Sequence, residues 1–235
     1  MKHTIKNKTI TVIIAAFRAE FYIKETVKSI LSQTLPDGWR LQLIVGVDGC
    51  KQTKLALNKL KDSRLHKYMM TKNMGTYTTF NTMMRYAEGD IILRFDADDV
   101  MYEGMLSAGI EEVLKGRGLI QFKCKEFPKS SYVRIPHGIL MFTRETWNKV
   151  GGFQPWRCGA DTYFIQAALY FSCSRKILDN KVYFGVRKGP NTLTSSKKTG
   201  FGSPYRKKIQ SQVHKGHNSK VSYQGVPLGA RCVKI

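Results

Sequence analysis

The chain has 235 residues, of which 42% are hydrophobic and 11% aromatic, a composition typical of a folded domain with a sizeable core. Lys and Arg number 39 against 17 Asp and Glu, giving a net charge of +22, so we expect a polyanionic partner: nucleic acid, an anionic membrane surface or an acidic glycan. We expect no membrane span and no signal peptide, and the 5 scattered cysteines without a CxxC pair indicate free thiols in a reducing, cytoplasmic compartment.

The first hundred residues alternate predicted strands with predicted helices. Residues 9–16 are β-branched and apolar throughout, as is typical of a central parallel strand. Further strands are predicted at 41–47, 66–70 and 90–95, and helices at 20–33, 52–61 and 77–87. This order predicts a mostly parallel α/β sheet whose ligands bind at the C-terminal ends of the strands.

Acidic residues follow two of these predicted strands. Asp48 ends the second strand, and Asp96, Asp98 and Asp99 come directly after the fourth. Because side chains alternate along a strand, Asp96 and Asp98 are expected to point the same way, with Asp99 turned aside. Two convergent carboxylates suit Mg²⁺ or Mn²⁺, although an acidic turn that caps the next helix explains the same pattern.

The second half changes character. We predict helices at 102–115 and 144–150, strands at 119–125, 131–135 and 139–142, and a helix that Asp161 opens. After Asp179 no acidic residue remains, and from Lys188 onward we expect mostly loop with one short helix near 205–213.

Several short motifs follow one another along the chain. They are Thr11–Phe17, Ser29–Thr34, Val47-Asp48-Gly49, Asn73-Met74-Gly75, Asn81, Gly89-Asp90, Asp96–Asp99, Gly151-Gly152-Phe153 and Gly159-Ala160-Asp161. In order and spacing, over about residues 9 to 200, the chain resembles the GT-A-fold glycosyltransferases, most closely the inverting group called family 2. The resemblance implies a nucleotide-sugar-binding α/β half at 1–100, an acceptor-side half of the same domain at 101–186, and a basic, loop-rich extension at 187–235.

The resemblance implies a donor site, with a UDP-sugar favoured. Asp48 accepts a hydrogen bond from uracil or an equivalent base edge, and Ala16 and Glu20 line the same pocket. A simple Asp-Gly turn is the alternative for Asp48, and an acid that favours the helix dipole is the alternative for Glu20. Arg94 either holds a phosphate or forms a salt bridge.

The resemblance also implies a metal site that takes Mn²⁺ or Mg²⁺. Asp98 binds the metal, and Asp96 contacts the ribose, the metal or a metal-bound water. Family members often carry a metal-binding His in a segment like Arg187–Thr194, which has no His here. His137, His214 or His217 supplies the missing ligand, or Arg187 or Lys188 meets the diphosphate directly, or the metal is held by fewer protein ligands.

Asp161 is the candidate general base, which deprotonates the acceptor hydroxyl in an inverting transfer. The resembling families place an acidic pair at the start of this helix, whereas Ala160 replaces the first acid here. The alternative is that Asp161 caps the helix.

For the acceptor, basic and aromatic residues mix in the last fifty residues. The candidate polyanion-binding cations are Lys197, Lys198, Arg206, Lys207 and Lys208. We favour hydroxymethylated pyrimidine in DNA, a phage-type modification, over a peripheral membrane enzyme acting on a surface or lipid-linked glycan. A solvated tail and a non-catalytic nucleic-acid-binding protein on the same scaffold are the remaining alternatives.

Overall fold

The computed structural model describes residues 5, 7–127, 132–187, 197–200, 202–216 and 231–235. Its first half contains the strands β1 (Thr9–Ala16), β2 (Arg40–Val47), β3 (Leu65–Met70) and β4 (Ile91–Asp96). Between them lie the helices α1 (Ile23–Leu31), α2 (Lys51–Asn58) and α3 (Thr76–Met83), the last continued by the 3₁₀ turn η1 (Met84–Tyr86). Every strand and helix predicted up to residue 96 is present.

The second half contains more, shorter strands. They are β5 (Val100–Met101), β6 (Leu119–Phe122), β7 (Cys124–Phe127), β8 (Val133–Arg134), β9 (Leu140–Thr143), β10 (Arg175–Leu178), β11 (Phe184–Arg187) and β12 (Cys232–Lys234). The helices are α4 (Met105–Leu114), α5 (Arg144–Val150), α6 (Ala160–Tyr170) and α7 (Pro204–Gly216). The predicted short helix of the basic extension corresponds to α7.

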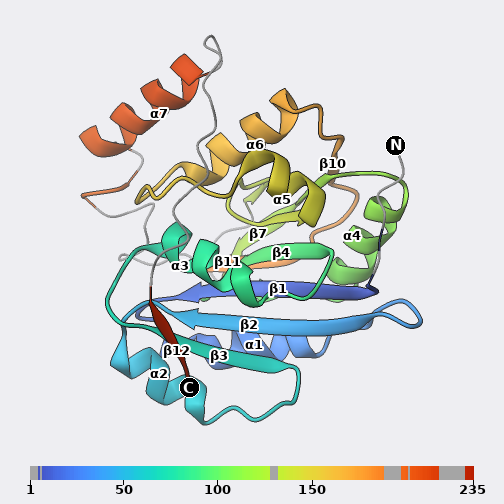
Figure 1. Ribbon diagram of the computed structural model, residues 1–235, viewed down its shortest axis with the longest axis vertical. Coiled ribbons are helices and arrows are strands. Elements are labelled where there is room, and N and C mark those ends of the chain that lie inside the picture. The colour runs from blue at the N-terminus through green and yellow to red at the C-terminus, as the bar shows by residue number, and fades with distance from the viewer. Residues whose placement is uncertain (1–4, 6, 128–131, 188–196, 201, 217–230) are drawn as a thin grey trace.

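The strands form two sheets. The main sheet has the order β10-β6-β9-β4-β1-β2-β3-β12, and a smaller one has the order β5-β11-β7-β8. The pairs β4-β1, β1-β2 and β2-β3 are parallel, whereas β9 runs antiparallel to both β4 and β6. A mostly parallel central sheet, covered by helices, is therefore confirmed (Figure 1).

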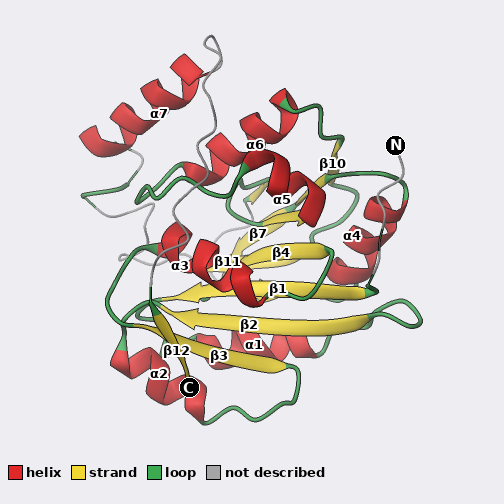
Figure 2. Ribbon diagram, viewed as in Figure 1, coloured by secondary structure: helices red, strands yellow, loops and turns green. Residues whose placement is uncertain are grey.

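Alternate side chains of β1 enter two different cores. Val12 and Ile14 belong to the cluster that includes α1, α2 and α4, and Ile13 belongs to the one that includes α3, α5 and α6. The sheet is thus a middle layer between two helical layers, which is why seven of the eight β1 residues are buried (Figure 2). Among the described residues no helix is long and apolar enough to cross a bilayer.

Three features differ from the sequence expectations. The predicted strand 119–125 divides at Lys123, whose backbone pairs with Leu178 and Tyr183, so that β6 and β7 belong to different sheets. Helix α1 begins at Ile23 rather than residue 20, because the residues before it form a turn with Arg18 at φ 53°. The expectation of loop at the C-terminus is wrong for β12, which pairs antiparallel with β3 at the sheet edge.

Candidate functional site

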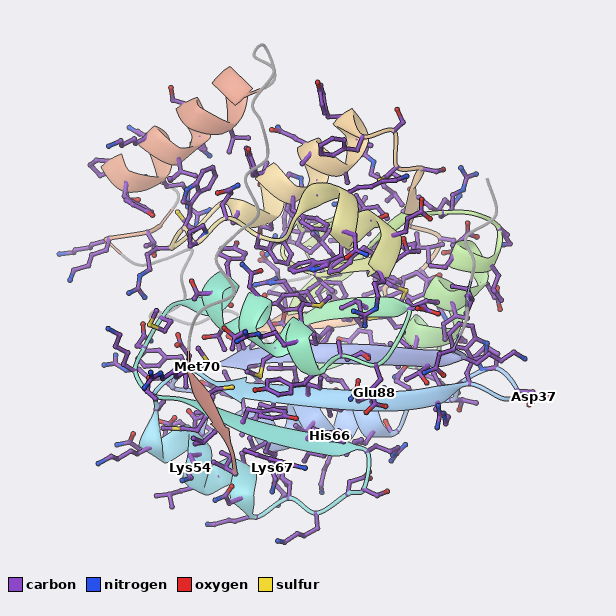
Figure 3. The ribbon with its side chains drawn as sticks, viewed as in Figure 1. Asp37, Lys54, His66, Lys67, Met70 and Glu88 are labelled. Atoms are coloured by element: carbon purple, nitrogen blue, oxygen red, sulfur yellow. The ribbon has the colours of Figure 1, made fainter. Side chains whose placement is uncertain are left out.

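The C-terminal ends of the central strands β1, β2 and β4 lie side by side, and together they form the C-terminal edge of the main sheet. Ala15 of β1 lies opposite Gly46 of β2 on one side and Asp96 of β4 on the other. Asp48 and the acids that follow β4 therefore flank the same strand end. Asp37 lies in the loop that precedes β2, at the opposite edge, as Figure 3 shows.

A pocket of about 470 Å³ opens at this edge. It is lined by Phe17, Arg18, Glu20, Gly49, Cys50, Lys51 and Gln52. Thr53 fixes one wall, because its hydroxyl donates to Glu20 Oε2 (3.2 Å) and accepts from the backbone N–H of Ala19 (3.0 Å). Ala16, predicted to line the pocket, is fully buried just before it. Its role stays a prediction.

Asp48 holds the loop that precedes α3. Its two carboxylate oxygens accept the backbone N–H groups of Met74 (2.6 Å) and Gly75 (2.9 Å), and the residue is only 2% exposed. Gly49 has φ +69°, and a Cβ there would lie 2.5 Å from the Asn73 backbone nitrogen. Asp48 is thus more than a turn residue, and its contact with a base stays a prediction.

Arg94 forms the salt bridge that was one of its two alternatives. Its Nη2 lies 2.9 Å from Asp96 Oδ1, its Nη1 donates to the Gly138 carbonyl, and its guanidinium carbon lies 5.3 Å from the centre of the Tyr77 ring. Arg94 is buried, whereas the Asp96 side chain is 39% exposed. Partial burial raises the pKa of Asp96, with the Arg94 charge opposing and the Asp161 charge adding to that rise.

Asp98 and Asp99 complete the acidic cluster. Burial, followed by the charge of Asp96, raises the pKa of Asp98 to about 6. Asp99 is buried and turned aside, and its Oδ1 accepts the backbone N–H of Arg187 (3.1 Å). The side chain of Arg187 donates from Nε to the Asp98 carbonyl (3.2 Å) and from Nη2 to Glu25 (2.6 Å). Arg187 therefore holds the loop that carries Asp98 and Asp99.

Asp96 and Asp98 fit a divalent cation. Both carboxyl groups have raised pKa values, because each is partly desolvated beside another acid, and a bound cation relieves that cost. Mg²⁺ is commonly held by one or two carboxylates, with waters and substrate phosphates completing its shell. No third His, Cys, Asp or Glu joins them in the part of the chain that the structure describes.

The proposed additional ligands are not in place or lie outside the described residues. The exposed ring of His137 shares a hydrogen bond with the Thr162 hydroxyl (2.9 Å). Lys188, the rest of the 188–196 segment, His217 and the side chain of His214 are among the parts not described. Among the described residues, Asp96 and Asp98 therefore remain the candidate metal ligands.

Asp161 lies in the first turn of α6 but does not cap it. The N-cap is Gly159, with φ 78° and no side-chain cap bond, so the capping alternative is wrong. Asp161 Oδ1 accepts the backbone N–H of the next residue, Thr162 (2.8 Å). A Cβ added at Gly138 would lie 3.5 Å from Asp96 Oδ2 and 3.7 Å from Asp161 Oδ2. The two carboxylates thus converge beside Gly138.

The basic helix α7 packs against the N-terminal part of α6. Its buried residues Ile209 and Val213 pack with Tyr163 of α6 and with Trp156, and a Cβ at Gly159 would lie 2.9 Å from Ile209 Cγ2. Figure 1 shows α7 at one side of the molecule, next to α6. The N-terminal turn of α6 is therefore fixed by a small apolar contact with the extension.

The predicted polyanion-binding cations divide into two kinds. Lys197, Lys198, Lys207 and Lys208 are exposed, as a contact surface requires. Arg206 instead donates from Nε to the Thr199 carbonyl (2.7 Å), so part of its role is to hold the start of α7. Whether the five contact a polyanion stays a prediction.

Sequence reasoning missed Gly138 and Tyr77. Gly138 belongs to a Pro-His-Gly loop without a recognisable motif, and its lack of a side chain leaves room between two carboxylates. From the sequence Tyr77 is an ordinary core position in α3, yet its ring packs on Arg94, and burial together with the charge of Asp161 raises its pKa well above the usual value. Only the three-dimensional arrangement reveals either role.

The chain shares sequence with several curated proteins, among them the following two. One is a chondroitin synthase from Pasteurella multocida (strain Pm70), 25% identical over 85% of this chain and 23% of its own length. Another is UDP-Glc:alpha-D-GlcNAc-diphosphoundecaprenol beta-1,3-glucosyltransferase WfgD from Escherichia coli, 28% identical over 45% of this chain and 41% of its own. The chain thus spans less than half the length of either relative.

Solved structures share the fold. The S. aureus TarS fragment 1-349 in complex with UDP-GlcNAc has a TM-score of 0.73 and 17% identity over 92% of this chain and 68% of that one. The mannosyltransferase PcManGT from Pyrobaculum calidifontis, in complex with GDP-Man and Mn2+, has a TM-score of 0.68 and 16% identity over 91% and 65%. The GT-A-like fold is therefore confirmed. Since the profile described as glycosyl transferase family 2 matches residues 11–180, the chain belongs to that family.

Proposed function

We propose that the chain transfers a sugar from a nucleotide-sugar donor, with a UDP-sugar favoured, to an acceptor hydroxyl. The observation that carries this proposal is the convergence of Asp96 and Asp161 beside Gly138, at the strand edge where a pocket of about 470 Å³ opens. The pocket has the size of a small-molecule site. Family membership and the nucleotide-sugar complexes of the structural neighbours support the same reading.

The reaction follows from the placement of the two carboxylates. Asp161 takes the proton of the acceptor hydroxyl while the acceptor oxygen attacks the anomeric carbon from the face opposite the diphosphate, so the configuration inverts. Asp98 and Asp96 would hold Mn²⁺ or Mg²⁺, which would supply positive charge to stabilise the departing diphosphate. Arg94 keeps Asp96 oriented, since the two groups lie 2.9 Å apart.

For the acceptor we propose a glycan hydroxyl. The names of the two curated relatives, a chondroitin synthase and a glucosyltransferase acting on a diphosphoundecaprenol-linked sugar, favour it. Hydroxymethylated pyrimidine in DNA is the second candidate, favoured by the net charge of +22. The proposed compartment is the cytoplasm, in keeping with five cysteines that are all free in the structure.

The experiment is a screen of nucleotide sugars with Mn²⁺ against three acceptors: a lipid-diphosphate-linked sugar, an acidic oligosaccharide and hydroxymethylated DNA. We expect the Asp161→Asn variant to lose transfer to whichever acceptor the parent modifies. Transfer to DNA alone would reverse the ranking of acceptors. Tight nucleic-acid binding without turnover of any donor would favour the non-catalytic alternative and refute the proposal.

A further inference from the structure

Three aromatic side chains are exposed between β1 and α1. Phe17 is 44% exposed, Phe21 82% and Tyr22 37%, and we call this segment, residues 17–22, the aromatic turn. Its beginning lines the candidate donor pocket, because Phe17, Arg18 and Glu20 all belong to the pocket wall. Single exposed apolar residues are common on proteins, whereas three large rings within six residues at the mouth of a site indicate a contact surface.

The aromatic turn is held in place by its own backbone. The N–H groups of Tyr22 and Ile23 donate to the Ala19 carbonyl (2.9 and 2.8 Å), and the N–H of Ala19 donates to Thr53 of α2 (3.0 Å). Phe21 is therefore presented to solvent by a turn with fixed hydrogen bonds. An anchor of this kind loses little conformational entropy when it binds.

Cations surround the aromatic turn. Arg18 lies within it, Lys51 lines the same pocket, and Lys24 and Lys28 lie four residues apart on the exposed side of α1. The nearby acids are engaged: Glu20 accepts from Thr53 (3.2 Å), and Glu25 accepts from Arg187 (2.6 Å). Aromatic rings beside lysines match the interface of an anionic bilayer, where rings insert among headgroups and cations meet lipid charges.

We propose that the aromatic turn and the lysines of α1 dock the protein on an anionic lipid surface. A second copy of the chain fits less well, because a two-fold contact would bring the same cations together. Single-stranded nucleic acid also fits less well, since the Phe21 and Tyr22 rings meet edge to face (64° between their planes) and offer no parallel platform for successive bases.

Docking in this way sets the candidate donor pocket beside the headgroups, where a lipid-linked acceptor is presented. The inference deepens the proposed glycan acceptor without depending on sugar transfer. Vesicle binding is measured without donor, so a failure of docking and a failure of catalysis are separate results.

The experiment measures sedimentation of the full chain with vesicles of phosphatidylglycerol and phosphatidylcholine, and with phosphatidylcholine alone. We expect binding to the anionic vesicles only. Phe21→Ser should weaken it about tenfold, as loss of a partly buried ring implies. The pair Lys24→Gln and Lys28→Gln should weaken it about 25-fold, because each cation near an anionic surface contributes about fivefold.

Matched variants lie elsewhere on the surface. Leu114→Ser removes an exposed apolar residue at the end of α4, and Arg175→Gln with Lys176→Gln removes two exposed cations from β10. Both variants should bind vesicles with an affinity within about twofold of that of the parent, since neither site belongs to the proposed lipid-binding surface. Phe21→Trp should keep binding and show a blue-shifted emission with anionic vesicles.

Several outcomes would overturn the proposal. They are equal vesicle binding by Phe21→Ser and the parent, an unshifted emission from Phe21→Trp, and a dimer of the parent that Phe21→Ser abolishes. Retention on duplex DNA that depends on Phe21, with no binding to vesicles, would likewise assign the surface to nucleic acid.

Discussion

At the proposed donor end of the site, the acids Asp48, Asp96 and Asp98 are fixed by the sheet and its loops. At the proposed acceptor end, Asp161 lies at the start of a helix that packs on a small separate cluster. Asp48 accepts two backbone N–H groups, and Asp96 lies 2.9 Å from the buried Arg94. The acceptor end depends on Tyr163, Ile209 and Val213, which form a cluster apart from the two main cores.

This difference agrees with the proposed division of the site into a donor end and an acceptor end. The donor end gathers like charges in a partly desolvated place, which raises the pKa values of Asp96 and Asp98 and favours a cation. The acceptor end carries exposed cations on α7 and a single carboxylate. We therefore expect changes at the donor end to abolish turnover and changes at the acceptor end to alter acceptor use.

The largest effect is expected from Asp98→Ala. Losing this carboxylate should reduce metal-dependent donor turnover by roughly 10³-fold or more, because a metal contributes several kcal/mol to the stabilisation of developing charge. Thermal unfolding should be unchanged or slightly higher, since the change removes one of two neighbouring like charges. Turnover measured across Mn²⁺ concentrations checks this, with Asp37→Ala at the opposite edge as the control (Figure 3). Full transfer by Asp98→Ala in excess chelator would refute the metal site.

The next effect belongs to Asp161→Asn. We expect kcat to fall by roughly 10²-fold or more while donor affinity changes little, as loss of a general base implies. Because Gly159 is the N-cap and asparagine keeps the Oδ1 that accepts the N–H of Thr162, the melting temperature should stay close to that of the parent. Single-turnover kinetics with separate donor titration measures both quantities. A variant that melts early yet keeps its specific activity would contradict the assignment.

The sequence predicted the donor end better than the acceptor end, for a physical reason. Strands buried on both faces are mostly apolar, so residues 9–16, 41–47 and 90–95 were recognisable as strands, and the acids that follow them mark the strand ends. Local spacing alone therefore located Asp48, Asp96 and Asp98 at one edge.

The acceptor end depends on contacts distant in sequence. Nothing near residue 138 indicates that it separates Asp96 from Asp161, and β12 has only three residues, too few for a pattern. The second contact of Arg94 was missed for the same reason, because the Gly138 carbonyl lies 44 positions away. Such features come from tertiary packing, which local patterns do not encode.

A moderate effect is expected from Ile209→Ala. The side chain is buried against α6 and touches the position of Gly159, so its truncation should loosen α7 at a cost of about 2 kcal/mol. Acceptor KM should rise by roughly tenfold while donor hydrolysis without acceptor is retained. Leu114→Ala, at an exposed apolar residue on α4, is the control for a non-specific loss of stability or activity. Equal losses of donor hydrolysis and transfer would show that the two ends are not separable.

The smallest effect on turnover is expected from replacing the four exposed lysines of the extension, Lys197, Lys198, Lys207 and Lys208, by Gln. Arg206 is left in place because it holds the Thr199 carbonyl (2.7 Å). Donor hydrolysis should change by less than about twofold, since these side chains are assigned away from the nucleotide pocket. If each lysine neutralises a phosphate of duplex DNA, the slope of log affinity against log salt should fall by about 0.9 for every lysine replaced.

Acceptor tests on this quadruple lysine variant then distinguish the glycan acceptor from the DNA acceptor. Under the glycan proposal, transfer to a lipid-linked sugar persists even where DNA binding has become weak, because docking at the aromatic turn uses Phe21, Lys24 and Lys28 instead. Under the DNA alternative, modification of hydroxymethylated DNA at physiological salt falls together with the slope. A quadruple lysine variant that modifies such DNA as well as the parent would remove the extension from acceptor binding altogether, since exposed cations that carry binding cannot be neutralised without weakening it.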